Sequence, residues 1–387
     1  LILFPLFQIS AFAIRLQRSA SNSPASTAAL QSSTSATPDV YYILLDGYSR
    51  ADVMRSLYDL DITPFMEDLK SLGFVFPDCA QSNYGITAFS MYATLNMQYL
   101  DAQPGTFPLG SDRREVDYQA MREYLINSQV RQFFQAHGYQ MITFETGFWW
   151  LNIDNADQYI VENNNPLKKY SKEYALSNFE DLFIRTTALR ILTEANTAFF
   201  SSLTRQVKTP TQQHYEWVQF SLEQLGQIPA IPGKKFVYFH VLAPHDPFVF
   251  APDGSYHFYS NDTSDVPGYP NEVTYLNKRI AEIVRGLITS SPTPPIIIIQ
   301  GDHGWDPRYR MQILNAYYLP NGGAQRLYPT ITPVNTFRLI LDHYFGAKYD
   351  LLPDASYFSM GSDFPVYGIR STPYQLTPVP GSCMDSP

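Results

Sequence analysis

The sequence predicts a layered α/β fold with a mostly parallel central sheet. Three short runs of apolar, β-branched and aromatic residues, Val40–Leu45, Phe236–Leu242 and Pro295–Ile299, are continuous rather than alternating. Continuous runs suit strands that are covered on both faces, as in parallel sheets. Helical periodicity appears between them, around residues 52–72, 118–137, 170–203 and 273–287. Strands that alternate with helices indicate a sheet with helices on both faces.

Size and composition exclude several classes of protein. The chain has 387 residues, of which 45% are hydrophobic, so it can bury a large core and is not globally disordered. It carries 27 Lys+Arg against 36 Asp+Glu, a net charge of −9, and has no basic tract. This balance argues against a nucleic acid as the main partner. Two cysteines exclude a disulfide scaffold and a cysteine-rich zinc fold.

The N-terminal residues predict a membrane anchor and a spacer. Residues 1–14 are apolar apart from Gln8 and Ser10, and the chain does not begin with Met. Because about 20 residues are needed to span a bilayer, we interpret residues 1–18 as the end of a transmembrane helix. A signal peptide and a buried core helix are the alternatives. Residues 19–37, rich in Ser, Ala and Thr, are typical of a flexible linker before a domain over residues 38–387.

All three strand-like runs end in residues that bind metals or anions. Asp46 follows the first run, His245 follows the second, and Asp302 with His303 follows the third. Ligands in α/β sheets gather beyond the carboxyl ends of strands. An Asp-Gly pair after one strand is ordinary turn chemistry, but three such strand ends together favour a site. Carboxylates and imidazole are suitable ligands for a divalent ion such as Zn²⁺ or Mn²⁺.

A fourth candidate is Thr87, at the start of a helix predicted over residues 87–100. A threonine in this place is most often a helix cap. A helix start also favours anions, because its free N–H groups and its dipole point toward them. A threonine hydroxyl held there by a metal would be an activated nucleophile.

The order of these segments resembles the alkaline phosphatase/sulfatase superfamily. It is most similar to the membrane-anchored branch that contains lipoteichoic acid synthases and phosphoethanolamine transferases. The resemblance covers about residues 38–345. Its most specific parts are Tyr42–Gly47, Gly301–Gly304 and the stretch Leu95–Leu100 on the helix after Thr87.

The resemblance implies a three-layer sandwich with a loop-rich C-terminal edge, and it implies roles for individual residues. Thr87 would be the nucleophile, and His245 would contact the substrate's phosphate or protonate the leaving group. His240 is a secondary candidate for substrate binding, with a satisfied core histidine as the alternative. One divalent ion is implied, with Mn or Zn favoured and Mg or Ca also compatible. Its ligands would be Asp46, Thr87, Asp302 and His303.

The resemblance also implies a reaction class. The chain would be a metal-dependent phospho-group transferase or phosphoester hydrolase that acts on lipid head groups or envelope glycans. The formylglycine motif of sulfatases, Cys or Ser two residues before Pro and four before Arg, is absent around Cys79 and Cys383. A sulfuric-ester hydrolase with the same pocket and a catalytically silent envelope domain remain as alternatives.

The sequence gives conflicting signals about the side of the membrane on which the catalytic domain lies. Arg15 and Arg18 follow the apolar N-terminal residues, and positive residues favour the cytoplasmic side of a membrane. A preceding helix would override two arginines. From the resemblance we expect a membrane-anchored enzyme whose catalytic domain is extracytoplasmic.

Overall fold

A computed structural model describes residues 37–100, 118–162, 209–259, 267–358 and 377–384. All of them belong to the compact unit Thr37–Pro387. The predicted anchor, the linker before Thr37 and the helix predicted over residues 170–203 lie outside the described residues. Within these ranges, no helix is both long and apolar enough to cross a membrane.

The centre of the structure is a six-stranded sheet in the order β3-β2-β4-β1-β5-β6. Neighbouring strands are parallel except for β5 and β6, which confirms the predicted mostly parallel sheet. The three apolar runs of the sequence form the adjacent strands β4, β1 and β5. The strands are β1 (Val40–Leu45), β2 (Gln140–Phe144), β3 (Gln158–Ile160), β4 (Lys235–Val241), β5 (Ile296–Gly301) and β6 (Asn315–Tyr318).

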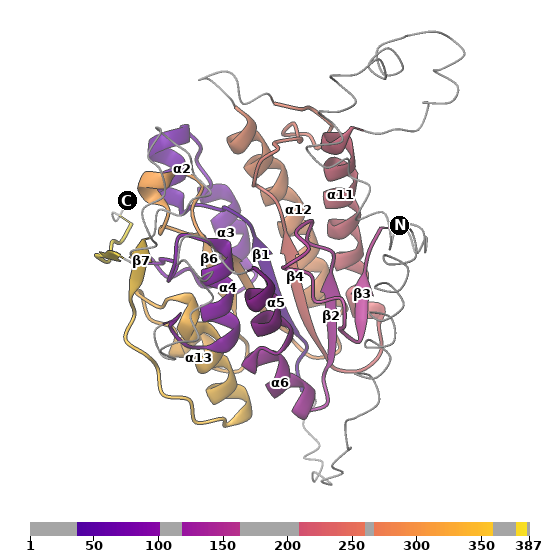
Figure 1. The fold of residues 1–387 in the computed structure, drawn as a ribbon, viewed down its shortest axis with the longest axis vertical. Helices are drawn as coiled ribbons and strands as arrows, with labels where there is room; N and C mark the ends of the chain where they lie inside the picture. Colours follow the sequence, from indigo (N-terminus) through magenta and orange to yellow (C-terminus); the bar gives the residue numbers. More distant parts are fainter. Residues whose placement is uncertain (1–36, 101–117, 163–208, 260–266, 359–376, 385–387) are drawn as a thin grey trace, which may run out of the picture. The chain divides into compact units, whose positions relative to one another are not determined.

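Helices cover both faces of this sheet (Figure 1). Their bounds are α2 (Ala51–Tyr58), α3 (Thr63–Ser71), α4 (Thr87–Asn96), α5 (Tyr118–Ile126), α6 (Gln129–Ala136), α11 (Pro210–Gln227), α12 (Gly268–Ser290) and α13 (Pro333–Phe345). Short 3₁₀ turns are η2 (Ile228–Ala230), η3 (Pro307–Tyr309) and η4 (Gly323–Arg326).

Two helices predicted as continuous are each divided in two. The helix predicted over residues 52–72 is broken because Asp59 takes a left-handed conformation with φ 50° and ends α2. The helix predicted over residues 118–137 is broken at Ser128, whose extended backbone begins α6. The apolar periodicity therefore located the helices but not the breaks.

The residues of β1 alternate between two hydrophobic cores. Tyr41, Ile43 and Leu45 belong to one core, together with residues of α3, α11 and α12. Val40, Tyr42 and Leu44 belong to the other, with residues of α4, α5, α6 and α13. Both faces are therefore buried, which explains the continuous apolar runs and confirms three layers.

At the C-terminal edge, β7 (Ser356–Phe358) pairs antiparallel with β8 (Thr377–Val379). Beyond β8, Cys383 forms a disulfide with Cys79, 304 residues earlier in the chain. The sequence did not predict this pairing.

The sheet register brings three strand ends together. Leu45, the last residue of β1, is paired with Val241 of β4 on one side and with Gly301 of β5 on the other. The chain therefore leaves the carboxyl ends of these three adjacent strands at residues 46, 242 and 302, on the same side of the sheet. This edge is where ligands of such sheets bind.

We predict that Gly301→Ala destabilises the protein by about 1–3 kcal/mol, because overpacking forces the backbone to shift. A Cβ at this position would lie 2.4 Å from the carbonyl oxygen of Tyr48. The matched control is Gly286→Ala in α12, where a Cβ meets nothing within 4 Å. It should stabilise the helix by up to about 1 kcal/mol. Denaturant unfolding of both variants measures the change in the free energy of unfolding, which should be negative for Gly301→Ala and positive for Gly286→Ala. Equal changes in the two variants would contradict the packing argument.

Candidate active site

The turn after β1 carries Asp46 and hydrogen-bonds to Asp302, and both carboxylates are buried. Asp46 directly follows β1, and its N–H donates to the carbonyl of Val241 (3.1 Å). The next residue, Gly47, has φ 76°, a left-handed conformation that favours glycine. Its N–H donates to Asp302 Oδ1 at 2.9 Å. The backbone of one strand end thus orients the carboxylate of another.

Helix α12 supports this turn through Tyr269. The Tyr269 hydroxyl donates to the carbonyl of Gly47 (2.9 Å) and accepts from the N–H of Ser49 (3.0 Å). Ser49 Oγ in turn accepts from the N–H of Trp305 (2.9 Å). The turn that carries Asp46 and the loop that carries Asp302 are therefore held by one buried network.

His303 presents a lone pair to this cluster. Arg310 Nη2, which can only donate, lies 2.9 Å from His303 Nε2. The other ring nitrogen, Nδ1, donates to the carbonyl of Gly304 (3.1 Å). Burial, together with the positive charge of Arg310, lowers the pKa of His303 to about 4. The ring is therefore neutral at pH 7, as a metal-binding imidazole must be.

Three oxygen atoms surround His303 Nε2. Thr87 Oγ1 lies at 3.0 Å, Asp302 Oδ2 at 3.2 Å and Asp46 Oδ1 at 3.9 Å. Both carboxylate oxygens are buried and accept no hydrogen bond from the described residues. Ligands about 2.0–2.2 Å from a tetrahedral metal lie about 3.4 Å from one another. The spacing of the three oxygens around His303 Nε2 is compatible with a divalent cation, and the two orphaned carboxylate oxygens are suited to bind one.

His240 lies behind Asp46. Its Nε2 donates to Asp46 Oδ2 (3.0 Å), because a carboxylate only accepts, and its Nδ1 pairs with the Tyr238 hydroxyl (3.1 Å). Ligand atoms of Asp46, His240 and Asp302 lie within 4.8 Å of one another. Both ring nitrogens have protein partners and the side chain is buried. This position fits a residue that positions Asp46, in line with the satisfied core histidine given as the alternative, and a substrate contact of His240 stays a prediction.

The ionised form of Asp46 is favoured. Burial opposes ionisation, but the hydrogen bond from His240 and the nearby charges of His245 and His240 hold the pKa of Asp46 below its usual range. A buried carboxylate that stays charged is suited to binding a cation.

Thr87 is the first residue of α4, as the sequence predicted, although the helix ends at Asn96 rather than at residue 100. The helix ends early because Met97 is left-handed, with φ 54°. Ile86 precedes α4 with an extended backbone, and no described side chain caps the helix start. The Thr87 hydroxyl therefore faces His303 while the helix start remains available to an anion.

His245 lies on the loop after β4 and is more exposed than Asp46, Asp302 and His303. Its side chain is 25% exposed, and its ring contacts the rings of Trp305 and Phe148 (centroids 5.2 and 6.4 Å apart). Burial alone would lower the pKa of His245, but hydrogen bonding to Asp246 and the charge of Asp46 raise it to about 9. The ring therefore carries a proton at neutral pH.

The sequence missed Arg310. Its buried guanidinium donates to the carbonyls of Gly85 (2.8 Å) and Trp305 (3.2 Å) as well as to His303. It thus joins the loop before Thr87 to the loop after β5. No sequence signal separates Arg310 from Arg308, which is exposed and pairs with Asp306.

The site defines an α/β enzyme with a candidate metal centre beside a helix start. The chain belongs to the sulfatase family, whose model matches residues 38–337. This match confirms the resemblance to the alkaline phosphatase/sulfatase superfamily that the sequence motifs indicated, and it supports a hydrolase or transferase of that superfamily. A search of curated proteins finds no match.

Solved structures agree with this fold. The lipoteichoic acid synthase LtaP from Listeria monocytogenes is similar with a TM-score of 0.51 at 12% identity, covering 85% of this chain and 79% of that chain. The zinc complex of the C-terminal periplasmic domain of EcEptC from Escherichia coli gives 0.49 at 12%, covering 86% and 92%. The putative sulfatase yidJ from Bacteroides fragilis gives 0.47 at 13%, covering 86% and 83%.

We predict that Asp302→Asn weakens binding of Mn²⁺ or Zn²⁺ by more than about 100-fold, more than loss of an outer-shell partner usually costs. The asparagine can still accept from Gly47 through Oδ1, but it replaces the orphaned Oδ2 with a donor. The metal-free variant should melt higher than the wild type, because repulsion from Asp46 is removed. Calorimetry and thermal unfolding measure both effects. Asp306→Asn is the control, and wild-type affinity in Asp302→Asn would rule out the site.

A buried acid anchors the loop that carries His245. Glu272 of α12 accepts from the N–H of Val249 (2.8 Å) through Oε2, while no described residue pairs with its Oε1. Burial raises the pKa of Glu272 to about 8, although hydrogen bonds from Val249 and Phe250 offset part of the effect. The carboxyl is therefore mostly protonated at neutral pH.

We predict that Glu272→Gln removes a pH dependence of stability. Between pH 4.5 and about 8, the folded protein keeps a proton on Glu272 that the unfolded chain has lost. The contribution of Glu272 to wild-type stability therefore falls through this window by up to about 1.4 kcal/mol per pH unit. The stability of Glu272→Gln relative to wild type should rise from pH 5 to pH 8 in urea titrations. A pH-independent difference would contradict the assignment.

Proposed function

We propose that the chain is a metal-dependent phospho-group transferase or phosphoester hydrolase with Thr87 as its nucleophile. One observation carries this proposal. The Thr87 hydroxyl lies at a helix start, 3.0 Å from a neutral imidazole nitrogen that also faces two buried carboxylate oxygens without donors. A catalytically silent domain has no need to retain this costly convergence.

The proposed metal ligands are Asp46, Thr87, Asp302 and His303. A divalent ion bound there would lower the pKa of the Thr87 hydroxyl and neutralise charge on the transferring group. The start of α4 offers N–H donors to the same group. The net charge of the chain is −9, so the attraction for an anionic substrate must come from these local groups.

Transfer then proceeds in two steps. Thr87 Oγ1 loses its proton to solvent and attacks phosphorus, and the bond from phosphorus to the leaving oxygen breaks while protonated His245 supplies the proton to that oxygen. Water or an acceptor alcohol next gives its proton to His245 and attacks the phosphorus of the phosphothreonine. The bond from phosphorus to Thr87 Oγ1 breaks, and Oγ1 takes up a proton from solvent. Arg310 lies between the Thr87 loop and His303, and we propose that it orients the transferring group.

The cysteines favour phosphate over sulfate transfer. Cys79 and Cys383 are joined in a disulfide, so neither is a precursor of the formylglycine that sulfatases use. Threonine cannot be converted to formylglycine. The family match nevertheless keeps a sulfuric-ester hydrolase as the second candidate.

We propose an extracytoplasmic catalytic domain tethered by the N-terminal residues. Disulfides persist in oxidising compartments, which supports this location. Similar structures include a periplasmic domain and a lipoteichoic acid synthase, as well as Ps i-CgsB in complex with a neocarrahexaose. Lipid head groups and envelope glycans are therefore the proposed substrate classes.

We predict that Thr87→Ala lowers turnover of a phosphoester by at least about 10³-fold, as loss of a nucleophile does. Metal binding should weaken but remain measurable, because the other three ligands stay. Thr87→Ser keeps the hydroxyl and should retain part of the activity. Thr274→Ala, which removes an exposed threonine of α12, is the control. Unchanged turnover in Thr87→Ala would exclude the nucleophile assignment.

Parallel assays with aryl phosphate, aryl phosphodiester and aryl sulfate esters, at saturating Mn²⁺ or Zn²⁺, choose between the candidates. Phosphoester turnover that depends on Thr87 supports the proposal. Faster sulfate turnover would favour the sulfatase. No turnover together with no metal binding would favour the silent domain.

A further inference from the structure

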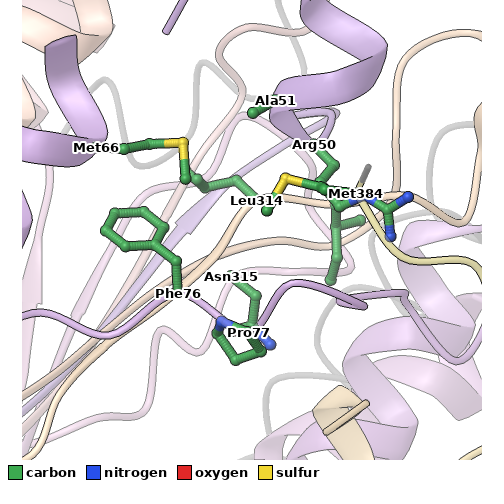
Figure 2. Close-up of a pocket in the computed structure, with 9 residues that line it drawn as sticks. Arg50, Ala51, Met66, Phe76, Pro77, Leu314, Asn315 and Met384 are labelled. Carbon is green, nitrogen blue, oxygen red and sulfur yellow. The ribbon is translucent and has the colours of Figure 1, made fainter. Parts of the chain in front are cut away.

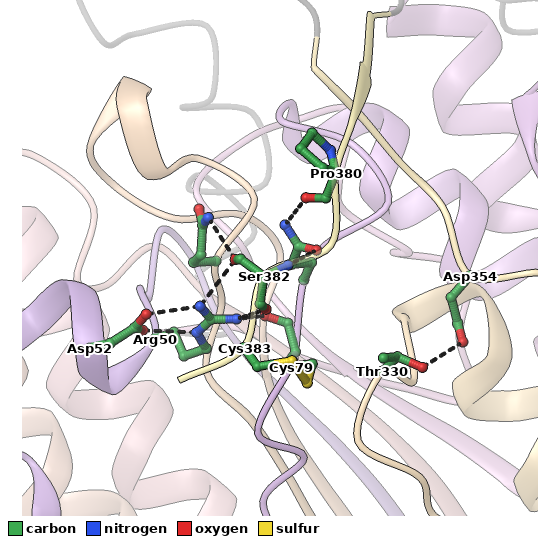
Figure 3. The surroundings of a disulfide bond; sticks show 11 residues. Arg50, Asp52, Cys79, Thr330, Asp354, Pro380, Ser382 and Cys383 are labelled. Carbon is green, nitrogen blue, oxygen red and sulfur yellow. Dashed lines mark hydrogen bonds and ion pairs between the residues drawn. A yellow bond between two sulfur atoms is a disulfide. The ribbon is translucent and has the colours of Figure 1, made fainter. Parts of the chain in front are cut away.

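The C-terminal residues 377–384 lie against the active-site loops, and we call them the strap. The strap begins with β8, which pairs with β7. β7 in turn contacts the Thr87 loop, since the N–H of Tyr357 donates to the carbonyl of Asn83 (2.8 Å). Beyond β8 the carbonyl of Pro380, labelled in Figure 3, accepts a hydrogen bond from Gln81 Nε2 (3.3 Å). The strap thus contacts the loop that leads to Thr87 directly at Gln81 and indirectly through β7.

One strap residue, Ser382, bonds to three of the four segments that carry site residues, all except the loop of His245. Its carbonyl accepts from Arg50 Nη1 (2.7 Å), on the segment that follows Asp46. Its N–H donates to Gln81 Oε1 (3.2 Å), before Thr87, and its hydroxyl accepts from Gln312 Nε2 (3.1 Å), after Asp302 and His303. These contacts are polar and partly exposed, so each is individually weak.

The next two residues fix the strap in place. Cys383 forms the disulfide with Cys79, and the N–H of Met384 donates to the carbonyl of Asp78 (2.9 Å). The Met384 side chain lines a small pocket with Met66, Phe76 and Leu314 (Figure 2). The strap is therefore held by one covalent bond, one partly buried side chain and a short strand.

We propose that the Cys79–Cys383 disulfide is a redox-sensitive lock that holds the strap on the active-site loops and so regulates the proposed transferase. The predicted change in turnover rests on the proposed function. The predicted release of the strap on reduction does not. The strap residues Pro378, Pro380, Gly381 and Cys383 are exposed, so little apolar surface holds them when the bond is open. Release would loosen the segments that position Asp46, Thr87 and Asp302.

The chemistry is thiol–disulfide exchange with a dithiol reductant. A thiolate attacks the exposed Cys383 sulfur, the Cys79 sulfur leaves and takes up a proton, and a mixed disulfide forms. The second thiol of the reductant then displaces Cys383, which becomes a thiol, while the reductant becomes a disulfide. A disulfide oxidant reverses the exchange and locks the strap again. Cys79 is buried, so the reductant approaches from the Cys383 side.

The test compares wild-type protein, oxidised or treated with dithiothreitol, with the Cys79→Ser/Cys383→Ser variant. Amide hydrogen exchange of peptides that cover residues 79–87 and 377–384 should accelerate about tenfold on reduction, with the sheet unchanged. Turnover of an aryl phosphoester should fall several-fold and recover after reoxidation. The double variant should match reduced wild type in both measurements and should not respond to dithiothreitol.

The readouts separate the two proposals. Unchanged exchange in the strap after complete reduction would overturn the lock, and so would faster exchange with unchanged turnover. If no ester is turned over, Mn²⁺ affinity replaces turnover as the readout, and lower affinity on reduction supports the lock while unchanged affinity overturns it. If the double variant does not fold, reduced wild type that retains its far-ultraviolet circular dichroism serves alone.

Discussion

Two buried carboxylates face one neutral imidazole, and the rest of the structure depends on this unfavourable arrangement. Asp46 Oδ1 and Asp302 Oδ2 have no hydrogen-bond donor among the described residues. A buried carboxylate without a partner is costly, and two of them repel each other. The arrangement persists because the sheet register fixes the strand ends, and because the Gly47 N–H and the His240 ring satisfy the other carboxylate oxygens. A bound cation would neutralise the two carboxylate oxygens that accept no hydrogen bond.

This constraint also explains why glycines flank the cluster. Gly47 takes a left-handed conformation so that its N–H reaches Asp302. A Cβ on Gly301 would meet the Tyr48 carbonyl at 2.4 Å, and one on Gly304 would meet the Tyr309 carbonyl at 2.5 Å. The Asp302-His303 pair is thus enclosed by backbone on both sides. The motif around residues 301–304 is therefore required for packing, as well as carrying two of the proposed ligands.

The sequence predicted the parts of the site that depend on local pattern. The three central strands were recognisable because both of their faces are buried, and strand polarity then placed Asp46, Asp302 and His303 at one edge. Arg310 and the disulfide were not predictable, because they join segments distant in sequence. The contact of His240 with Asp46 was not predictable either, because spacing along β4 indicates which face the ring occupies but not that Asp46 approaches it from the neighbouring strand. The helix breaks depend on single backbone conformations, such as that of Asp59, which periodicity does not report.

The site residues differ in how they are positioned. Asp46, Asp302 and His303 directly follow strands of a sheet buried on both faces, so their backbone is held by the most cooperative part of the fold. Thr87 instead follows a loop without a strand of its own. That loop is held by the N–H of Ser82 donating to the Met311 carbonyl (2.7 Å), by Tyr357 and by Arg310. The backbone of Asp46, Asp302 and His303 is therefore held mainly by the sheet, whereas the position of the Thr87 hydroxyl depends more strongly on contacts from the C-terminal third of the chain.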